Sequence, residues 1–421
     1  MRFSIFYEHQ LPRPWDDGAE ARIVHEALEQ VQLADKLGFS TVWEVEHHFL
    51  EEYSHSSAPE VFLSACAATT QNIRIGHGIV PVLPGYNHPA RVAERIGTLD
   101  IISNGRVEFG TGETSSDMEL GGFEIARADK RAMWEEAVPE IAKMMSQSPY
   151  EGHTGKFFSM PARNVVPKPL QRPHPPMWVA CSQRDTILMA GQRGLGALSF
   201  SFIDPDEARQ WVSDYYAAFE ACTDPAGLAP NPNIAVTTGF MCHRDEQTAI
   251  DRGLDGFHFF AYSLLHYYAF GTHTPGATDI WTQFEENREE MGFAKLTATV
   301  QAAVGSEGAE NLVSAGGLDS LRGCIGTPDQ IREFVRAYED AGVDELIFVS
   351  QAGRNRHEDI CESMELFAKE VMPEFAERAP EREARKRERY AETIERLQNF
   401  HNLDLTPEVT TTIQAAATAT A

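Results

Sequence analysis

Two adjacent histidines preceded by a glutamate, Glu46-His47-His48, are the residues of this sequence best suited to chemistry. They end an apolar run, Thr41–Val45, that comes directly after a helix-like segment ending at Gly38. A β-branched and aromatic run after a helix stopped by Gly indicates a buried strand of a parallel α/β fold. Such folds build their sites at the carboxyl ends of the strands, where imidazoles and a carboxylate can exchange protons or bind a metal.

Two other interpretations of this cluster stay open. The three side chains can simply end a strand and hydrogen-bond to loops. A position at the end of a strand does not by itself establish a catalytic role. A metal site would need more ligands, and adjacent side chains on a strand point to opposite faces, which disfavours one ion shared by His47 and His48. We therefore expect no metal. The histidines near other predicted strand ends are His9, His55, His77 and His88.

Composition and charge exclude several classes of protein. The 421 residues carry 36 basic and 63 acidic side chains, and the formal net charge of −27 disfavours binding to nucleic acid or to anionic membranes. Six cysteines are scattered without a C-x-x-C pair, so neither a zinc site nor a disulfide framework is indicated. No apolar run approaches the length of a membrane span. We expect a cytoplasmic protein.

Runs of β-type residues alternate with helical patterns along most of the chain. One amphipathic helix is predicted before Gly38, another over Lys130–Gln147, and a third from a capping-box start at Thr327. Eight β/α repeats predict a (β/α)8 TIM barrel over residues 1–378, followed by a C-terminal extension over 379–421. The predicted strands are Phe3–Tyr7, Thr41–Val45, Arg74–Val80, Val107–Gly110, Met177–Cys181, Ala197–Phe202, Asn233–Phe240 and Glu345–Ser350.

An aromatic-rich insertion, Asp251–Arg322, separates the seventh and eighth predicted strands. Aromatic residues at helical spacing usually belong to a core, and exposed ones also mark subunit contacts. An insertion at the mouth of a barrel can instead form a lid that excludes water. We predict a lid, and we expect the set Phe257, Phe260, Tyr262 and Tyr268 to include pocket-lining residues, while other aromatics form a small core of the insertion.

Other segments also depart from the simple repeat. Tyr150–Pro176 is too long and too rich in Pro for a plain β/α connection, and a short hairpin strand is predicted at Lys156–Phe158. A charged helix is predicted over Pro380–Asn399, on the surface or against a neighbour. The Thr/Ala tail Thr406–Ala421 is expected to be mobile.

Two loops have features that suit a phosphate or a flat ring. Gly110–Ser115 follows a strand with the form GxGxxS, but the next clear helix begins only near Lys130, so the dinucleotide fingerprint is not met. Cys181, Ser182 and Arg184 stand at a predicted helix start, where free N–H groups and a partial positive charge suit a phosphate. An ordinary Ser N-cap explains the second pattern equally well.

A long collinear set of residues resembles the bacterial luciferase-like monooxygenases, which are flavin-dependent barrel enzymes. The resemblance covers roughly residues 1–376 and is far more specific for the family than for a substrate. The matching residues are Thr41-Val42-Trp43 with Glu46-His47-His48-Phe49, Val82-Leu83-Pro84, His88-Pro89, Leu99-Asp100, Gly105-Arg106, Phe109-Gly110, Gly326-Thr327-Pro328, Phe367 and Val371-Met372-Pro373.

The resemblance also implies roles for individual residues. His47, with His48 beside it, falls where the family has its catalytic His. The flavin phosphate is expected at the helix start that carries Ser182, and the flavin ring over the third strand. The positions that match the family's cofactor-binding residues are Gly78, Val80, Thr114, Ser115, Arg131, Cys181, Ser182 and Arg184.

Two positions depart from the luciferase pattern. Gly112 replaces the reactive Cys of the fourth strand, and Cys181 replaces a Glu ahead of the phosphate-site Ser. Because of the first change, the resemblance does not imply light emission. It does not imply a long-chain aldehyde substrate either.

The resemblance implies that the enzyme uses reduced FMN as its cofactor and that a separate flavin reductase supplies it. The resemblance implies that the flavin reacts with O2 to give a hydroperoxide, held in a dry cavity, that oxygenates a small apolar organic substrate. His47 would act as a base or as a hydrogen-bond partner. We expect a homodimer or homotetramer.

Three other functions stay open at this stage. A deazaflavin-dependent oxidoreductase shares the barrel but transfers hydride without oxygen. A metal-dependent barrel hydrolase would hold a stoichiometric ion and be colourless. A non-catalytic flavin-binding protein would turn yellow without consuming reduced flavin productively.

Overall fold

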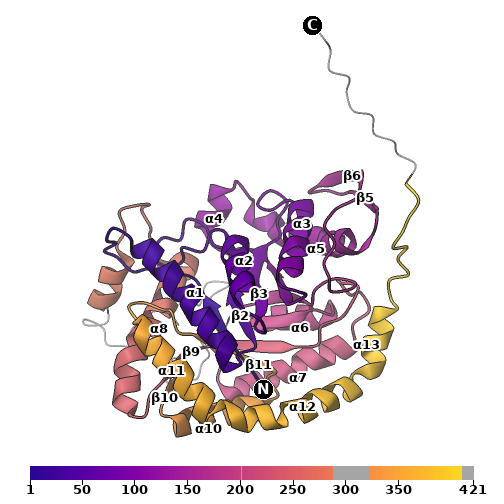
Figure 1. The fold of residues 1–421 in the computed structure, drawn as a ribbon. Helices are drawn as coiled ribbons and strands as arrows, with labels where there is room; N and C mark the ends of the chain where they lie inside the picture. The colour runs from indigo at the N-terminus through magenta and orange to yellow at the C-terminus, as the bar shows by residue number, and fades with distance from the viewer. Residues whose placement is uncertain (201, 288–321, 410–421) are drawn as a thin grey trace.

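The computed structural model, which describes residues 1–200, 202–287 and 322–409, has a closed parallel barrel at its centre (Figure 1). Each neighbouring pair of barrel strands runs parallel, and the last strand pairs with the first to close the ring. The predicted (β/α)8 TIM barrel is therefore confirmed. In order round the ring, the strands are β1 (Arg2–Tyr7), β2 (Thr41–Glu44), β3 (Arg74–Pro81), β4 (Val107–Gly112), β7 (Met177–Cys181), β8 (Gly196–Ser199), β9 (Ile234–Cys242) and β11 (Glu345–Val349).

The helices that follow these strands have local signals at their ends. Gly38 ends α1 with a φ of 86°, a left-handed conformation that suits Gly. Thr327 and Gln330 form the predicted capping box of α10, with Pro328 in its first turn. Among the described residues, the helices next to the barrel strands include α1 (Ala19–Leu37), α2 (Pro59–Thr69), α3 (Pro89–Ile102), α5 (Lys130–Ser146), α6 (Arg184–Gln192), α7 (Pro205–Glu220), α10 (Pro328–Ala341) and α11 (His357–Glu370).

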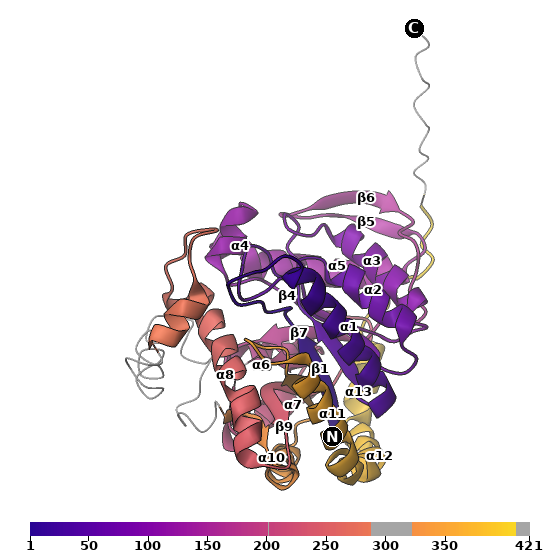
Figure 2. The same ribbon diagram turned by 60° about the vertical axis from the view of Figure 1, so that its left-hand side comes forward.

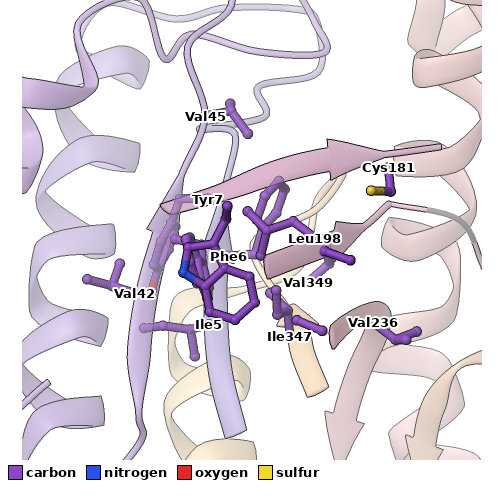
Figure 3. Close-up of a cluster of buried hydrophobic side chains, with 14 of the residues drawn as sticks. Ile5, Phe6, Tyr7, Val42, Val45, Cys181, Leu198, Val236, Ile347 and Val349 are labelled. Carbon is purple, nitrogen blue, oxygen red and sulfur yellow. The ribbon is translucent and has the colours of Figure 1, made fainter. Parts of the chain in front are cut away.

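The interior of the barrel is a packed core and not a pore. Buried side chains of several strands meet there, including the labelled Phe6 of β1 and Leu198 of β8 (Figure 3). The rings of Trp43 and Trp178 meet edge to face, with centroids 5.4 Å apart. Such aromatic packing adds to the burial of apolar area and makes the strand ends a rigid platform for a site.

Additional elements follow β4 and lie on the way to β7. They are α4 (Asp117–Gly122), a 3-10 turn η1 (Arg127–Asp129), and an antiparallel hairpin of β5 (Tyr150–Thr154) and β6 (Ser159–Arg163). The hairpin was predicted, but its position was wrong by several residues. Lys156–Phe158 lies in the turn, where the backbone N–H groups of all three residues donate to the carboxylate of Glu136.

The segment between β9 and β11 contains more regular structure than a loop insertion. It begins with the long helix α8 (Glu246–Leu265), which continues as the π-helical turn η2 (His266–Phe270). A short strand, β10 (Cys324–Gly326), pairs with the carboxyl end of β9. It was not predicted, because three residues are too few to show a strand pattern. Residues 288–321 of the predicted insertion lie outside the described residues.

The charged C-terminal segment packs on the opposite end of the barrel from α4 (Figures 1 and 2). It forms α12 (Met372–Arg389) and α13 (Ala391–Gln398), so α12 crosses residue 378, and Pro380 lies inside it instead of starting it. The ring of Phe375 contacts that of Phe3 in β1, with centroids 5.6 Å apart. Within the predicted tail, residues 410–421 lie outside the described residues.

Candidate active site

A cavity of about 350 Å³ opens at the carboxyl ends of the barrel strands. Its walls include the loops after β1, β2, β4 and β7, the starts of α5 and α6, and the inner side of α8 and η2. The volume is typical of a small-molecule site. The cavity occupies the end of the barrel where such enzymes carry their chemistry.

His47 lies in this cavity, in the loop after β2. Its backbone N–H donates to the carbonyl of Ser56 at 2.9 Å, which folds the loop back on itself. Its Nδ1 lies 3.1 Å from Oε1 of Glu119, and its Nε2 lies 3.9 Å from Oε1 of Glu8. The imidazole is therefore held between two carboxylates.

Glu119, on the short helix α4, was missed by the sequence analysis. It is fully buried, and its Oε1 accepts hydrogen bonds from the backbone N–H of His48 at 3.1 Å and from the hydroxyl of Tyr86 at 3.2 Å. The hydroxyl of Thr114 donates to its other oxygen. Ser116-x-x-Glu119 has the spacing of a helix start and is a signal that could have predicted α4, but nothing in the sequence links that helix to residue 47.

These carboxylates set the charge of the imidazole. Burial alone would lower the pKa of His47, but Glu119 and Glu8 outweigh burial and raise the pKa to about 9. Burial likewise tends to raise the pKa of Glu119, yet His47 and the hydrogen bonds from Thr114 and His48 bring it below its usual range. Burial raises the pKa of Glu8 to about 7, despite the opposing effect of His47. At neutral pH, His47 is an imidazolium and acts as a hydrogen-bond donor.

His48 points away from His47 and does not line the cavity. Its Nε2 lies 3.4 Å from Oε1 of Glu46, and its ring packs against Tyr86 and Phe123. The opposite directions of the two imidazoles follow from the alternation of side chains in an extended segment. The structure therefore brings only His47 into the cavity.

A second part of the cavity carries positive charge, and we call Arg127, Lys130 and Arg131 the cationic corner. Glu113 bridges two of them, with its oxygens 3.2 Å from Nζ of Lys130 and 2.8 Å from Nη2 of Arg131. The Nζ of Lys130 also donates to Oγ of Ser115 at 3.2 Å. Arg127 pairs with Asp117. Three cations against two carboxylates leave a local excess of one positive charge.

The start of α6 contributes to the same cavity through Ser182, Gln183 and Thr186. Cys181 is buried behind them, and burial raises its pKa to about 12, so its thiol stays protonated. The guanidinium of Arg184 lies outside the cavity, where its Nε pairs with Asp214 at 2.6 Å. Arg184 follows the predicted helix start but faces the outer surface.

Of the residues expected to contact the flavin ring, some line the cavity and one does not. Gly78, Thr114 and Ser115 line the cavity, whereas Val80 is buried outside it. The pairing of β3 with β4 shifts register between His77 and Val80, which turns this stretch relative to its neighbours. The roles of all these residues in cofactor binding stay predictions.

Neither a metal centre nor a membrane span is found in the described parts of the chain. Among residues 1–200, 202–287 and 322–409, no group of three or more His, Cys, Asp or Glu side chains is arranged to hold a metal ion. Within the same ranges, no helix is long and apolar enough to cross a membrane.

Comparison with known proteins identifies the family. A family model described as luciferase-like monooxygenase matches residues 1–345. The chain belongs to this family. As a member of this flavin-dependent group, the protein is an oxidoreductase of the monooxygenase class.

Curated relatives of this luciferase-like monooxygenase match over different lengths. The oxygenase component of flavin-dependent trigonelline monooxygenase from Acinetobacter baylyi is 27% identical over 384 residues, 90% of this chain and 96% of that protein. The uncharacterized protein y4vJ of Sinorhizobium fredii is 32% identical over 176 residues, and this match covers 42% of the chain and 49% of the relative.

Solved structures share the fold of this luciferase-like monooxygenase. Monooxygenase RslO1 from Streptomyces bottropensis has a TM-score of 0.67 at 24% identity, covering 89% of this chain and 100% of that one. The FMN complex of 3,6-diketocamphane monooxygenase from Pseudomonas putida has a TM-score of 0.64 at 18% identity, with 89% and 98% covered. The F420-dependent tetrahydromethanopterin reductase of Methanopyrus kandleri has a TM-score of 0.60 at 19% identity. The match covers 89% of this chain and 99% of that one.

The inner side of α8 and η2 covers the cavity of this luciferase-like monooxygenase with apolar side chains. Phe260, Leu264 and Tyr268 line it. Phe257 instead packs on Phe202, with ring centroids 4.9 Å apart. Tyr262 packs on Phe284 and accepts a hydrogen bond from the amide of Asn287 at 2.8 Å. Of the four aromatics predicted to include pocket residues, two face the cavity and two build the support behind it.

The chain that follows η2 is hydrogen-bonded to the loop that carries His47. The carboxylate of Glu52, fully buried, accepts the backbone N–H groups of Arg13 at 2.7 Å, Ile280 at 2.5 Å and Trp281 at 3.2 Å. Its neighbour Glu51 accepts the N–H of Gly276 at 2.7 Å. These bonds hold the chain that follows η2 against the loop after β2, and the ring of Trp281 packs on Phe259 of α8 with centroids 4.8 Å apart.

Proposed function

We propose that this luciferase-like monooxygenase uses reduced FMN and O2 to add one oxygen atom to a small organic substrate of largely apolar surface. The observation that best supports the proposal is a single cavity that joins the cationic corner to His47. When bound, reduced FMN supplies the electrons that activate O2. The protein's own residues hold the cofactor, donate a hydrogen bond beside it and keep water out.

The cationic corner and the start of α6 fit the phosphate of FMN. Guanidinium and ammonium groups form charge-assisted hydrogen bonds with phosphate, and a helix N-terminus adds free N–H groups and a partial positive charge. In a chain of net charge −27, an anionic cofactor needs such a local site. Glu113 keeps Lys130 and Arg131 in position but competes with the phosphate for their charge.

His47 is proposed to act as a donor at the reacting edge of the cofactor. Its pKa of about 9 keeps both ring nitrogens protonated at neutral pH. Its Nδ1–H is committed to Glu119, which leaves Nε2–H to face the cavity beside Glu8. A donor already oriented by a buried carboxylate stabilises developing negative charge without reorganisation.

The cover formed by Phe260, Leu264 and Tyr268 is proposed to exclude water from the reaction. Apolar walls protect reactive species from hydrolysis and side reactions. We propose that this segment acts as the substrate-side lid and sets specificity, in preference to a role as a subunit interface.

A separate flavin reductase is the proposed source of reduced FMN. The trigonelline relative is named as the oxygenase component of its enzyme, which supports a two-component arrangement here. A homodimer or homotetramer is proposed for the assembly. Because F420-dependent enzymes share the fold, hydride transfer from a reduced deazaflavin is the second candidate, and oxygen dependence separates the two.

The phosphate assignment is tested by comparing FMN with riboflavin, which lacks the phosphate. Combined Arg131→Ala and Ser182→Ala changes should weaken FMN binding by about 2–4 kcal/mol, as lost charge-assisted hydrogen bonds predict. Riboflavin binding, followed by flavin fluorescence, should barely change. Arg184→Ala is the matched control, since its guanidinium pairs with Asp214 outside the cavity. Equal losses for FMN and riboflavin, or none for either, would rule out this phosphate site.

A further inference from the structure

Two buried carboxylates in the cavity each have one oxygen without a hydrogen-bond partner among the described residues. Glu8 and Glu46 are 2% and 5% exposed, and both line the cavity. Oε1 of Glu8 accepts the hydroxyl of Tyr53 at 2.8 Å, and Oε1 of Glu46 accepts the amide of Asn87 at 2.8 Å. Oε2 of each carboxylate has no such partner. Burying a carboxylate with an unsatisfied oxygen is unfavourable unless a positive group compensates.

The positive charge already in the cavity does not compensate both carboxylates. His47 is shared between Glu119 and Glu8, and its closer contact is with Glu119. The cationic corner is occupied elsewhere, because two of its members pair with Glu113 and the third pairs with Asp117. Glu46 also has His48 beside it, with Nε2 3.4 Å from Oε1. Two imidazoles therefore face the three carboxylates Glu8, Glu46 and Glu119.

The walls near these carboxylates are aromatic. Tyr53, which donates to Glu8, packs on Phe260 of α8 with ring centroids 5.6 Å apart. Tyr268 of η2 lines the same cavity. Aromatic faces attract organic cations through the ring quadrupole, and rings together with carboxylates are the usual way in which proteins recognise quaternary and protonated amines.

We propose that the substrate of this enzyme is an organic cation, a compound with a quaternary or protonated nitrogen that binds between the aromatic cover and Glu8 and Glu46. The nitrogen charge balances the two carboxylates, and the apolar body of the compound fills the space under Phe260. The proposal rests on the monooxygenase function proposed above and specifies the substrate class of that same cavity.

The test uses a cationic and a neutral probe of the same shape, N-methylpyridinium and toluene. Binding of each to the FMN-loaded protein is measured by calorimetry or by ligand-observed NMR. We expect N-methylpyridinium to bind at least about tenfold more tightly, as a desolvated cation–aromatic contact with a nearby carboxylate predicts. Equal binding of the two probes to the wild-type protein would overturn the proposal without any variant.

Conservative variants locate the preference within the cavity. Glu8→Gln and Glu46→Gln should each lower the affinity for N-methylpyridinium by about fivefold or more while leaving toluene binding unchanged. Glu136→Gln is the matched control, a carboxylate outside the cavity that accepts the backbone N–H groups of Lys156–Phe158, and it should leave the preference intact. A cation preference unaffected by Glu8→Gln and Glu46→Gln would contradict the assignment.

The pH dependence gives a further readout. Glu8 is faced by His47 and Tyr53 from the loop after β2, by Glu119 from α4 and by Tyr268 from η2. Because its pKa is raised to about 7, Glu8 loses its charge below that pH, so cation affinity should rise as pH increases through 7. Glu8→Gln should abolish this rise. FMN affinity measured in the same samples separates failure of this inference from failure of FMN binding.

Discussion

Replacing Glu119 by Gln tests the electrostatic account of His47 without any cofactor. The carboxylate is fully buried and lies 3.1 Å from Nδ1 of His47. A hydrogen bond to a charged group contributes about 1.5–3 kcal/mol, and one pKa unit corresponds to about 1.4 kcal/mol. Glu119→Gln should therefore lower the pKa of His47 by about 1–2 units, from about 9 to about 7–8.

The assay is an NMR titration of the His47 imidazole from about pH 6 to pH 10, assigned with a His47→Gln variant. Glu113→Gln, which removes a carboxylate of the same cavity that contacts Lys130 and Arg131, should leave the titration unchanged. A wild-type His47 that titrates near its ordinary value, or one that does not respond to Glu119→Gln, would refute the reasoning.

The same shift predicts how stability depends on pH. The folded-state pKa of His47, about 9, lies above the value of about 6.5 in an unfolded chain. Protonated His47 therefore stabilises the fold fully below about pH 6.5, by about 3 kcal/mol, and this contribution is lost as pH rises toward 9. Denaturant unfolding should show a smaller loss over this range in Glu119→Gln than in the wild type.

Three further changes test other parts of the site. His47→Ala should keep the fold and FMN binding but lower coupled product formation roughly 10²–10⁴-fold, with a matching rise in hydrogen peroxide; wild-type turnover would make His47 structural. Phe260→Ala should raise peroxide release without changing the oligomer mass in light scattering, whereas the opposite result favours an interface. Gly112→Cys should destabilise the protein by about 1–3 kcal/mol, because its Cβ would lie 2.6 Å from Cδ1 of Ile79, and Ile79→Ala should relieve the loss.

Much of the barrel could be predicted from the sequence because its signals are local. Buried strands read as apolar runs, and the ends of α1 and α10 carry Gly38 and the Thr327–Gln330 capping box. The short strand β10 gave no such signal, since its three residues are defined only by pairing with β9. The start of α12 was misplaced because Pro380 was taken as a helix start although it lies within the helix.

The candidate site could be predicted only in part because it is built from contacts between distant residues. His47 was found from its place after a strand, but Glu119 and Glu8 contact it across 72 and 39 residues of chain. Arg184 was assigned from its position at a helix start, yet which way a side chain points depends on its neighbours, here Asp214 on α7. The position of His47 after a strand predicted that it lies at the carboxyl end of the barrel. The charge of its imidazole depends on Glu119 and Glu8, which only the folded chain brings next to it.

The central claim, oxygenation by reduced FMN, is tested most directly by turnover under labelled oxygen. The protein is mixed with photoreduced FMN or with reduced F420, with and without ¹⁸O₂, and with a panel of N-methylated heteroaromatics, amines, ketones and terpenes, and the products are read by mass. The account predicts a product that carries one ¹⁸O atom only when reduced FMN and oxygen are both present. A product formed without oxygen, by hydride transfer from reduced F420, would contradict it.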